Sequence, residues 1–126
     1  MQIPAGLKYT TDHEWIKVEG NTAWIGITDF AQSELGDIVF LDIDPNLSSI
    51  SKGDSFGNIE AVKTVGTLYA PCSGTVLEIN TTLNDNPETI NSDPYGDGWL
   101  IKIEITDASG LEKLMDDAEY KKQVGA

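Results

Sequence analysis

Residues 57–71 of this chain read Gly57-Asn58-Ile59-Glu60-Ala61-Val62-Lys63-Thr64-Val65-Gly66-Thr67-Leu68-Tyr69-Ala70-Pro71. Residue types typical of β-strands lie on both sides of Lys63, and no other basic residue lies between Lys52 and Lys102. If the two runs pair with each other, Lys63 lies at the exposed turn of a hairpin. Val62-Lys63-Thr64 lacks the Gly, Asn or Pro that usually marks a turn, so a strand lysine facing water is the alternative.

Runs of the same kind indicate strands along the rest of the chain. They are short, rich in branched or aromatic residues and separated by Gly, Pro, Asn or Asp, and they cover residues 38–43, 55–60, 67–70, 75–79 and 99–105. Earlier in the chain, residues 13–27 contain two alternating runs joined by Gly20-Asn21, which predicts a two-residue β-hairpin. This spacing predicts a mainly β fold, either a small sandwich or a barrel.

Short helical segments are expected between the strands. Asp29, with Gln32 three positions later, predicts one or two helical turns that end at Gly36. The connection over 80–99 is polar and long, and a cap at Asn86-Pro87 would supply another turn there.

The end of the chain has helical spacing. Ser109 and Glu112 form a capping-box pair ahead of it. One amphipathic helix is therefore expected over about 109–123, with its apolar face formed by Leu111, Leu114, Met115 and Ala118.

Size and charge narrow the classes of protein and partner. The 126 residues are enough for one domain, which we expect to span 1–126 with its core over about 7–106. With 8 basic and 21 acidic side chains, the formal net charge is −13, and all eight basic residues are lysines. Nucleic acid and anionic membranes are therefore poor partners, and like-charge repulsion favours a monomer.

The chain has no apolar run of bilayer length and no leader pattern at its start, so we expect a cytoplasmic protein.

Catalytic and metal-binding options are few. The single cysteine, Cys72, excludes an internal disulfide, and with the single histidine, His13, it cannot assemble the usual zinc site. A nucleophile and base pair formed by Cys72 and His13 is possible in principle. The alternative, which we favour, makes Cys72 a small core residue and His13 a structural hydrogen-bonding partner. No pair of carboxylates stands out as an acid and base.

Several ordered blocks of residues resemble the H protein of the glycine cleavage system. The likeness covers about residues 7–124 and is carried by Tyr9-Thr10-x-Asp12-His13-Glu14-Trp15-Ile16, residues 26–40, Lys52-Gly53-Asp54-x-Phe56-Gly57-x-Ile59-Glu60-Ala61-Val62-Lys63, residues 70–80, and Ile90-Asn91-x-Asp93-Pro94-Tyr95-Gly96-x-Gly98-Trp99. The resemblance implies a lipoyl/biotinyl-type hybrid barrel-sandwich with an added C-terminal helix. It also implies that Lys63 carries lipoic acid in amide linkage.

The chemistry of a lysine amine agrees with attachment by an outside enzyme. An attachment lysine should be exposed, mobile and free of competing neighbours, whereas a Schiff-base lysine needs burial or a nearby cation. Lys63 has the acidic residue Glu60 nearby and no cation. The chain offers no base to deprotonate Lys63, so a lipoyl-attaching enzyme must do so. Glu60 is interpreted as part of what that enzyme recognises.

The resemblance further implies a carrier that is not an enzyme. Its arm would visit the decarboxylating glycine dehydrogenase, the aminomethyltransferase and dihydrolipoamide dehydrogenase in turn, carrying the aminomethyl group of glycine. Docking to these enzymes should use the acidic surface and weaken with salt. Glu14 is the candidate for holding the cationic amine of the loaded arm. Donation of the lipoyl group to other complexes, known as lipoyl relay, is a possible additional role.

Rival carriers fit the residues less well. Biotinyl domains usually flank the lysine with methionines, whereas Val62 and Thr64 flank Lys63. The lipoyl domains of 2-oxoacid dehydrogenases usually place Asp before the lysine and lack the block at 13–15. A small binding module with an ordinary surface Lys63 is the rival from another class. The chain also departs from many relatives, which have serine where Ala61 stands and an acidic residue near Thr67.

Overall fold

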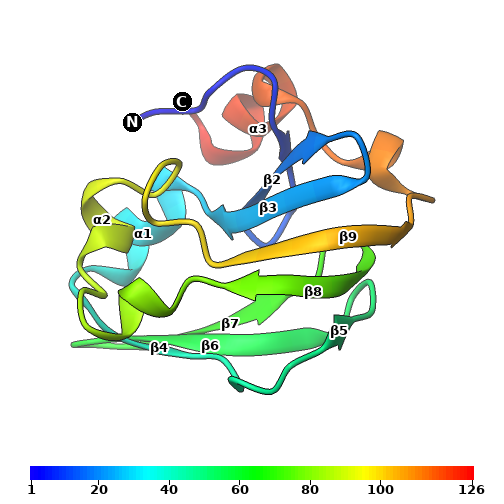
Figure 1. Ribbon diagram of the computed structural model, residues 1–126. Coiled ribbons are helices and arrows are strands. Elements are labelled where there is room, and N and C mark those ends of the chain that lie inside the picture. Colours follow the sequence, from blue (N-terminus) through cyan, green and yellow to red (C-terminus); the bar gives the residue numbers. More distant parts are fainter.

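The fold consists of two antiparallel β-sheets, and the computed structural model describes all 126 residues (Figure 1). A six-stranded sheet has the order β1-β2-β3-β9-β8-β5, and a three-stranded sheet has the order β4-β6-β7. The strands are β1 (Lys8–Tyr9), β2 (Glu14–Glu19), β3 (Thr22–Ile27), β4 (Ile38–Asp42), β5 (Ser49–Ile50), β6 (Ser55–Ala61), β7 (Val65–Tyr69), β8 (Ser73–Ile79) and β9 (Ile101–Asp107).

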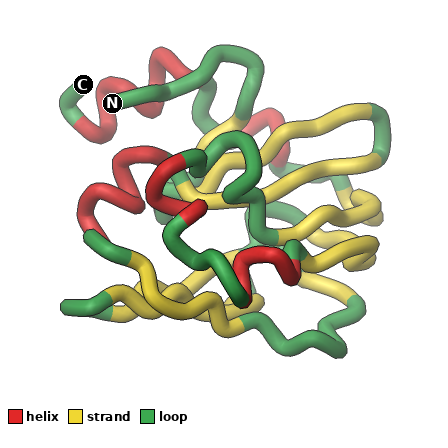
Figure 2. The backbone as a smooth tube through the Cα atoms, turned by 60° about the vertical axis from the view of Figure 1, so that its left-hand side comes forward, coloured by secondary structure: helices red, strands yellow, loops and turns green.

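Short helices connect the strands and end the chain. The α-helices are α1 (Asp29–Leu35), α2 (Thr89–Ser92) and α3 (Asp117–Val124), and the 3-10 turns are η1 (Thr81–Asn84) and η2 (Leu111–Lys113). Figure 2 shows α1 and α2 as red turns beside one end of the sheets. None of these helices is long and apolar enough to cross a membrane.

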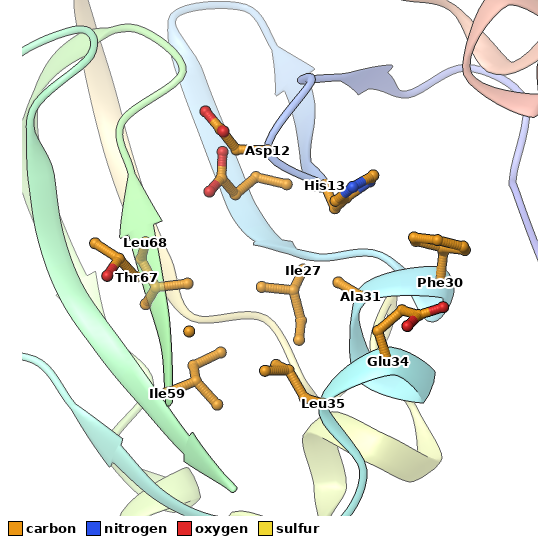
Figure 3. Close-up of a pocket in the computed structure, with 12 residues that line it drawn as sticks. Asp12, His13, Ile27, Phe30, Ala31, Glu34, Leu35, Ile59, Thr67 and Leu68 are labelled. Atoms are coloured by element: carbon orange, nitrogen blue, oxygen red, sulfur yellow. The ribbon is translucent and has the colours of Figure 1, made fainter. Parts of the chain in front are cut away.

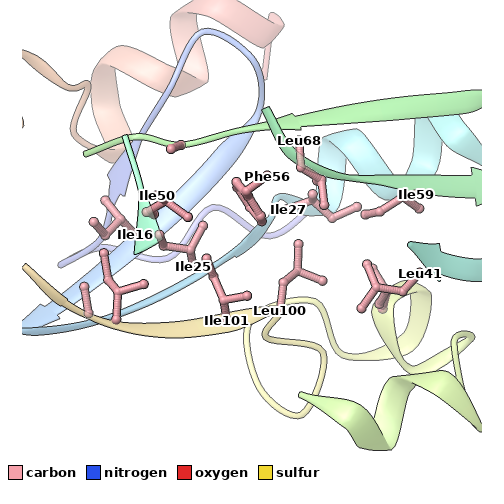
Figure 4. Packing of buried hydrophobic residues seen from close by; sticks show 14 of the residues in the cluster. Ile16, Ile25, Ile27, Leu41, Ile50, Phe56, Ile59, Leu68, Leu100 and Ile101 are labelled. Carbon is pink, nitrogen blue, oxygen red and sulfur yellow. The ribbon is translucent and has the colours of Figure 1, made fainter. Parts of the chain in front are cut away.

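The main hydrophobic core lies between the two sheets. Side chains from the facing sides of the two sheets fill this core, as expected for packed sheets. Figure 4 shows Ile25 and Ile101 of the larger sheet and Phe56 and Leu68 of the smaller sheet pointing into the same space. The predicted mainly β barrel-sandwich is therefore confirmed.

A second, aromatic cluster attaches α3 to the opposite side of the larger sheet. Tyr9, Trp15 and Tyr120 are buried together, and the rings of Tyr9 and Tyr120 stack with centroids 4.7 Å apart. Tyr120 is the only buried residue of α3. The short C-terminal helix is therefore held mainly by one aromatic side chain.

The hairpin over 14–27 and the helical turns from Asp29 to Gly36 are confirmed, whereas the capping residues predicted for the first two helices are wrong. The N-cap of α1 is Thr28, not Asp29, because the Thr28 hydroxyl accepts a hydrogen bond from Ala31 N; Gly36 ends the helix as predicted. The turn that starts at Asn86 has only 3-10-type bonds, and α2 begins at Thr89 without a side-chain cap.

The expected single helix over 109–123 is instead a 3-10 turn followed by the separate helix α3. Ser109 and Glu112 form no capping box; Asp116 and Glu119 form it. The break occurs where Met115 leaves helical geometry to exchange two backbone hydrogen bonds with Tyr9. Leu111 and Leu114 still pack on the core, as their spacing suggested, but Ala118 is exposed.

Candidate functional site

Lys63 lies at the tip of the β6–β7 hairpin. Glu60 pairs with Val65, Ala61 N donates to Thr64 O at 2.8 Å, and the Lys63 side chain is exposed. None of the residues at this tip has a positive φ, since His13 is the only non-glycine residue of the chain that does. The turn therefore needs no glycine. A tertiary contact helps to hold the turn, since Val62 N donates to Asp37 O at 3.0 Å. The predicted exposed turn is confirmed.

The Lys63 side chain runs over the end of α1. A Cβ atom at Gly36 would lie 3.2 Å from Lys63 Cε and 3.7 Å from Nζ. Gly36 also has φ +79°, a conformation that favours glycine, so this position has two reasons to lack a side chain. Leu35, the preceding residue, lies over Gly66 of β7, where an added Cβ atom would come within 3.2 Å of Leu35 Cδ2. Helix α1 therefore ends against the hairpin that carries the lysine.

The Lys63 amine has no ion-pair partner. The two ion pairs within 4 Å join Lys17 to Glu19 and Lys121 to Asp117. Glu60, although only three residues from Lys63, does not pair with it. The amine is exposed and free of competing neighbours, which are the properties expected of an attachment point.

A cleft of about 440 Å³ lies between α1, the start of β2 and the edge strand β7 (Figure 3). Its walls are partly apolar, and it is lined by Asp12, His13, Glu14, Ile27, Phe30, Ala31, Glu34, Leu35, Ile59, Gly66, Thr67 and Leu68. Leu35 and Gly66 belong both to this cleft and to the contact between α1 and the hairpin. The cleft therefore reaches the end of α1 over which Lys63 runs.

Glu14 is the buried carboxylate of this cleft. Only 1% of the residue is exposed. Its Oε1 accepts a hydrogen bond from Thr10 Oγ1 at 2.8 Å, and its Oε2 accepts one from Tyr69 N at 3.1 Å. Burial raises the pKa of Glu14 to about 7, although both hydrogen bonds favour the charged form. A cation entering the cleft would find a carboxylate that is held in place and poorly hydrated.

His13 and Cys72 are structural, as the favoured interpretation predicted. His13 Nδ1 lies 2.9 Å from the hydroxyl oxygen of Tyr120, and its ring lies 4.9 Å from that of Phe30. Burial lowers the pKa of His13, which favours the neutral ring. Cys72 is fully buried in the main core, where burial raises the pKa of its thiol to about 11, and no hydrogen bond joins it to His13. The alternative nucleophile and base pair is therefore not assembled.

Two supporting residues were missed by the sequence analysis. Asn91 of α2 donates to Gly36 O at 2.9 Å and accepts from Ile38 N at 3.0 Å, which fixes the link between α1 and β4 beside the hairpin tip. The hydroxyl oxygen of Tyr120 lies 2.6 Å from Thr28 Oγ1, so α3 supports the N-cap of the helix that walls the cleft. Asn91 stands in one of the blocks that carried the family resemblance, but no local pattern marks its role or that of Tyr120.

Comparisons with known proteins identify the family. The family model for the glycine cleavage H-protein matches residues 7–126. The chain belongs to this family. The glycine cleavage system H protein of Staphylococcus saprophyticus is 52% identical over 125 residues, which cover 99% of each chain. A crystal structure of a glycine cleavage system H protein from Mycobacterium marinum matches with a TM-score of 0.89 and 40% sequence identity, covering 98% of this chain and 100% of that one.

Two positions noted as departures from many H proteins lie near the site. Ala61 ends β6 and is paired with Ile38, so its side chain is half-buried next to the hairpin tip. Thr67 lines the cleft from β7, where a carboxylate would add to the acidic residues that already line it. Among the acidic residues that line this cleft, Glu14 is buried, whereas Asp12 and Glu34 are exposed.

Proposed function

We propose that this member of the H-protein family is the lipoyl carrier of the glycine cleavage system, with lipoic acid joined by an amide bond to Lys63 Nζ. The observation that carries the proposal is the placement of an exposed, unpaired lysine at the tip of a hairpin. The hairpin is paired with β4 on one side, and its tip is also bonded to Asp37, so the backbone under the lysine is fixed while the side chain is free.

Attachment of the arm requires an outside enzyme. An amide forms when Nζ bonds to the carbonyl carbon of an activated lipoyl group, while the bond to the leaving group breaks and Nζ gives up a proton. No side chain of this chain is placed to take that proton, because Glu60 makes no ion pair with Lys63 and His13 is engaged with Tyr120. The lipoyl-attaching enzyme therefore supplies the base, and Glu60 contributes to its recognition.

The chain itself acts as a non-catalytic carrier, with residues 1–126 forming one carrier domain. When bound, the lipoyl group supplies a dithiolane that takes up the aminomethyl group of glycine. The partners are the decarboxylating glycine dehydrogenase, the aminomethyltransferase and dihydrolipoamide dehydrogenase. Tethering raises the concentration of the arm at a docked enzyme towards the millimolar range. The carrier therefore needs to present the arm and requires no reacting side chains of its own.

The cleft beside Lys63 shelters the loaded arm in this proposal. The aminomethyl amine is cationic, and Glu14 offers it a buried carboxylate whose two other hydrogen bonds hold its orientation. Apolar wall residues such as Leu35 and Leu68 suit the hydrocarbon part of the arm. The Lys63 side chain runs over Gly36, which is next to Leu35 in the chain. The arm therefore starts beside the apolar wall of the cleft.

Intact-mass measurement tests the carrier proposal directly. Incubation with lipoate, ATP and a lipoyl-attaching enzyme should add one lipoyl group to the wild-type chain and none to a Lys63→Arg variant, which keeps the charge but offers no acylable amine. Lys52→Arg is the matched control, because Lys52 is also exposed, and it should gain the full mass. Modification that persists in Lys63→Arg, or a biotin-sized gain from cells supplied with both cofactors, would contradict the proposal.

A further inference from the structure

Exposed apolar side chains surround the Lys63 end of the three-stranded sheet. Val39 is 53% exposed, Phe40 47%, Val62 75% and Val65 58%. Together they form what we call the tip patch: Val39, Phe40, Val62 and Val65. Single exposed apolar residues are common, but a group at one end of one sheet is typical of a contact surface.

The strand register places Glu60 inside the tip patch. Phe40 of β4 is the cross-strand partner of Glu60, and Glu60 is the partner of Val65 of β7. Cross-strand partners project from the same face of a sheet, so the three side chains form one row with the carboxylate in its middle. The next row, Leu41, Ile59 and Gly66, faces the interior and contributes to the main core. The row that contains Glu60 is therefore on the outer face.

No segment of this chain covers the tip patch. In Figure 1 the helices α1, α2 and α3 and the strands β2, β3, β8 and β9 lie on the other side of β4 and β6. The charges near the patch are acidic, with Asp37 next to the hairpin tip and Glu60 in the row, and Lys63 is the only cation between Lys52 and Lys102. A partner complementary to this surface is apolar at its centre and carries a basic group opposite Glu60.

The short length of the lysine side chain determines which partner must contact this surface. The bare amine extends only one lysine side chain from the hairpin, so the enzyme that acylates it must bring its reacting carbon to the tip. Its surface will then lie over Val62, which precedes the lysine, and Val65, which opens β7 two residues after it. Enzymes that meet the far end of the finished arm are not bound by this constraint.

We infer that the tip patch, with Glu60 at its centre, is the docking surface for the lipoyl-attaching enzyme. The inference rests on the proposed acylation of Lys63 and adds the apolar contacts that recognition requires beyond the lysine and Glu60. Truncating a hot-spot residue at the centre of an interface weakens binding about tenfold or more.

The test compares rates of lipoyl attachment for variants that preserve strand propensity. Phe40→Thr and Val65→Thr, and the double variant, should lower kcat/KM for the carrier about tenfold or more, mainly by raising KM. Val62→Thr lies outside the strands, so it tests the same surface without touching the sheet. Leu77→Thr is the matched control, because Leu77 is 50% exposed on β8 of the other sheet, and it should react within about twofold of wild type.

The outcomes separate this inference from the proposed function. Lipoylation of the double variant and of Val62→Thr at the wild-type rate overturns the docking surface while leaving the carrier proposal intact. Lack of lipoylation in the wild-type chain overturns the carrier proposal itself. A concentration-dependent dimer in sedimentation that Phe40→Thr abolishes would assign the patch to a second copy of this chain and overturn the inference. Unchanged thermal unfolding of each variant shows that the fold is retained.

Discussion

Glu14 is the residue whose burial should be visible as a pH dependence of stability. Its pKa is raised from 4.5 to about 7 by burial. Between these values the folded protein keeps a proton that the unfolded chain has released, so the free energy of unfolding falls as pH rises through this interval and levels off above it. The fall is of the order of 3 kcal/mol. A Glu14→Gln variant has no such titration, and urea unfolding across the interval should show the wild type losing stability relative to it. A constant difference would contradict the assignment.

The same substitution tests the role of Glu14 in sheltering the load. Loss of a charge-assisted hydrogen bond should raise the rate at which the aminomethyl-loaded protein hydrolyses by about tenfold. Glu34→Gln is the matched control, because Glu34 lines the same cleft but is exposed. Equal hydrolysis rates in wild type and Glu14→Gln would show that the carboxylate does not hold the loaded amine.

At the scale of elements, helix α3 acts on the cleft through one hydroxyl group. Tyr120→Phe keeps the ring stacked on Tyr9 but removes the contacts of the hydroxyl with Thr28 and His13. We expect the free energy of unfolding to fall by about 1–2 kcal/mol, and the first amides of α1 to exchange faster with solvent, because the N-cap hydroxyl loses its buried partner. Urea unfolding and amide hydrogen exchange measure these effects. Lys122→Ala, an exposed change on α3, should stay within about 0.5 kcal/mol of wild type.

At the scale of the whole molecule, charge should control how fast partners associate. The net charge is −13, and acylation of Lys63 removes one positive charge, giving −13 − 1 = −14. Raising ionic strength from about 0.01 M to about 0.1 M shortens the screening length from roughly 30 Å to roughly 10 Å. The association rate with the aminomethyltransferase should therefore fall by about tenfold or more in stopped-flow measurements, while the dissociation rate changes little. An association rate indifferent to salt would show that the acidic surface does not steer docking.

Much of the fold was predictable because its signals are local. The hairpin at Gly20-Asn21 and the end of α1 at Gly36 both depend on backbone conformations that few residue types accept, and Gly20 and Gly36 have positive φ. Runs of branched and aromatic residues predicted seven of the nine strands, with boundaries shifted by up to two residues, whereas the two-residue strands β1 and β5 were not predicted. The exposed position of Lys63 was also predicted, although its turn carries none of the usual residues. That turn is held by strand pairing and by Asp37.

The chain alone established the class of fold, the acidic surface and the lysine that stands apart from other cations, since all of these follow from residue types and their spacing. Folding in three dimensions added the rest. The C-terminal helix starts late because Met115 bonds to Tyr9, and no neighbouring residue announces that pairing. Glu14 is buried and accepts hydrogen bonds from Thr10 and Tyr69. Glu60 lies at the centre of an apolar row because its cross-strand partners are Phe40 of β4 and Val65 of β7. Contacts between residues distant in the chain set burial, and burial determines what a carboxylate can do.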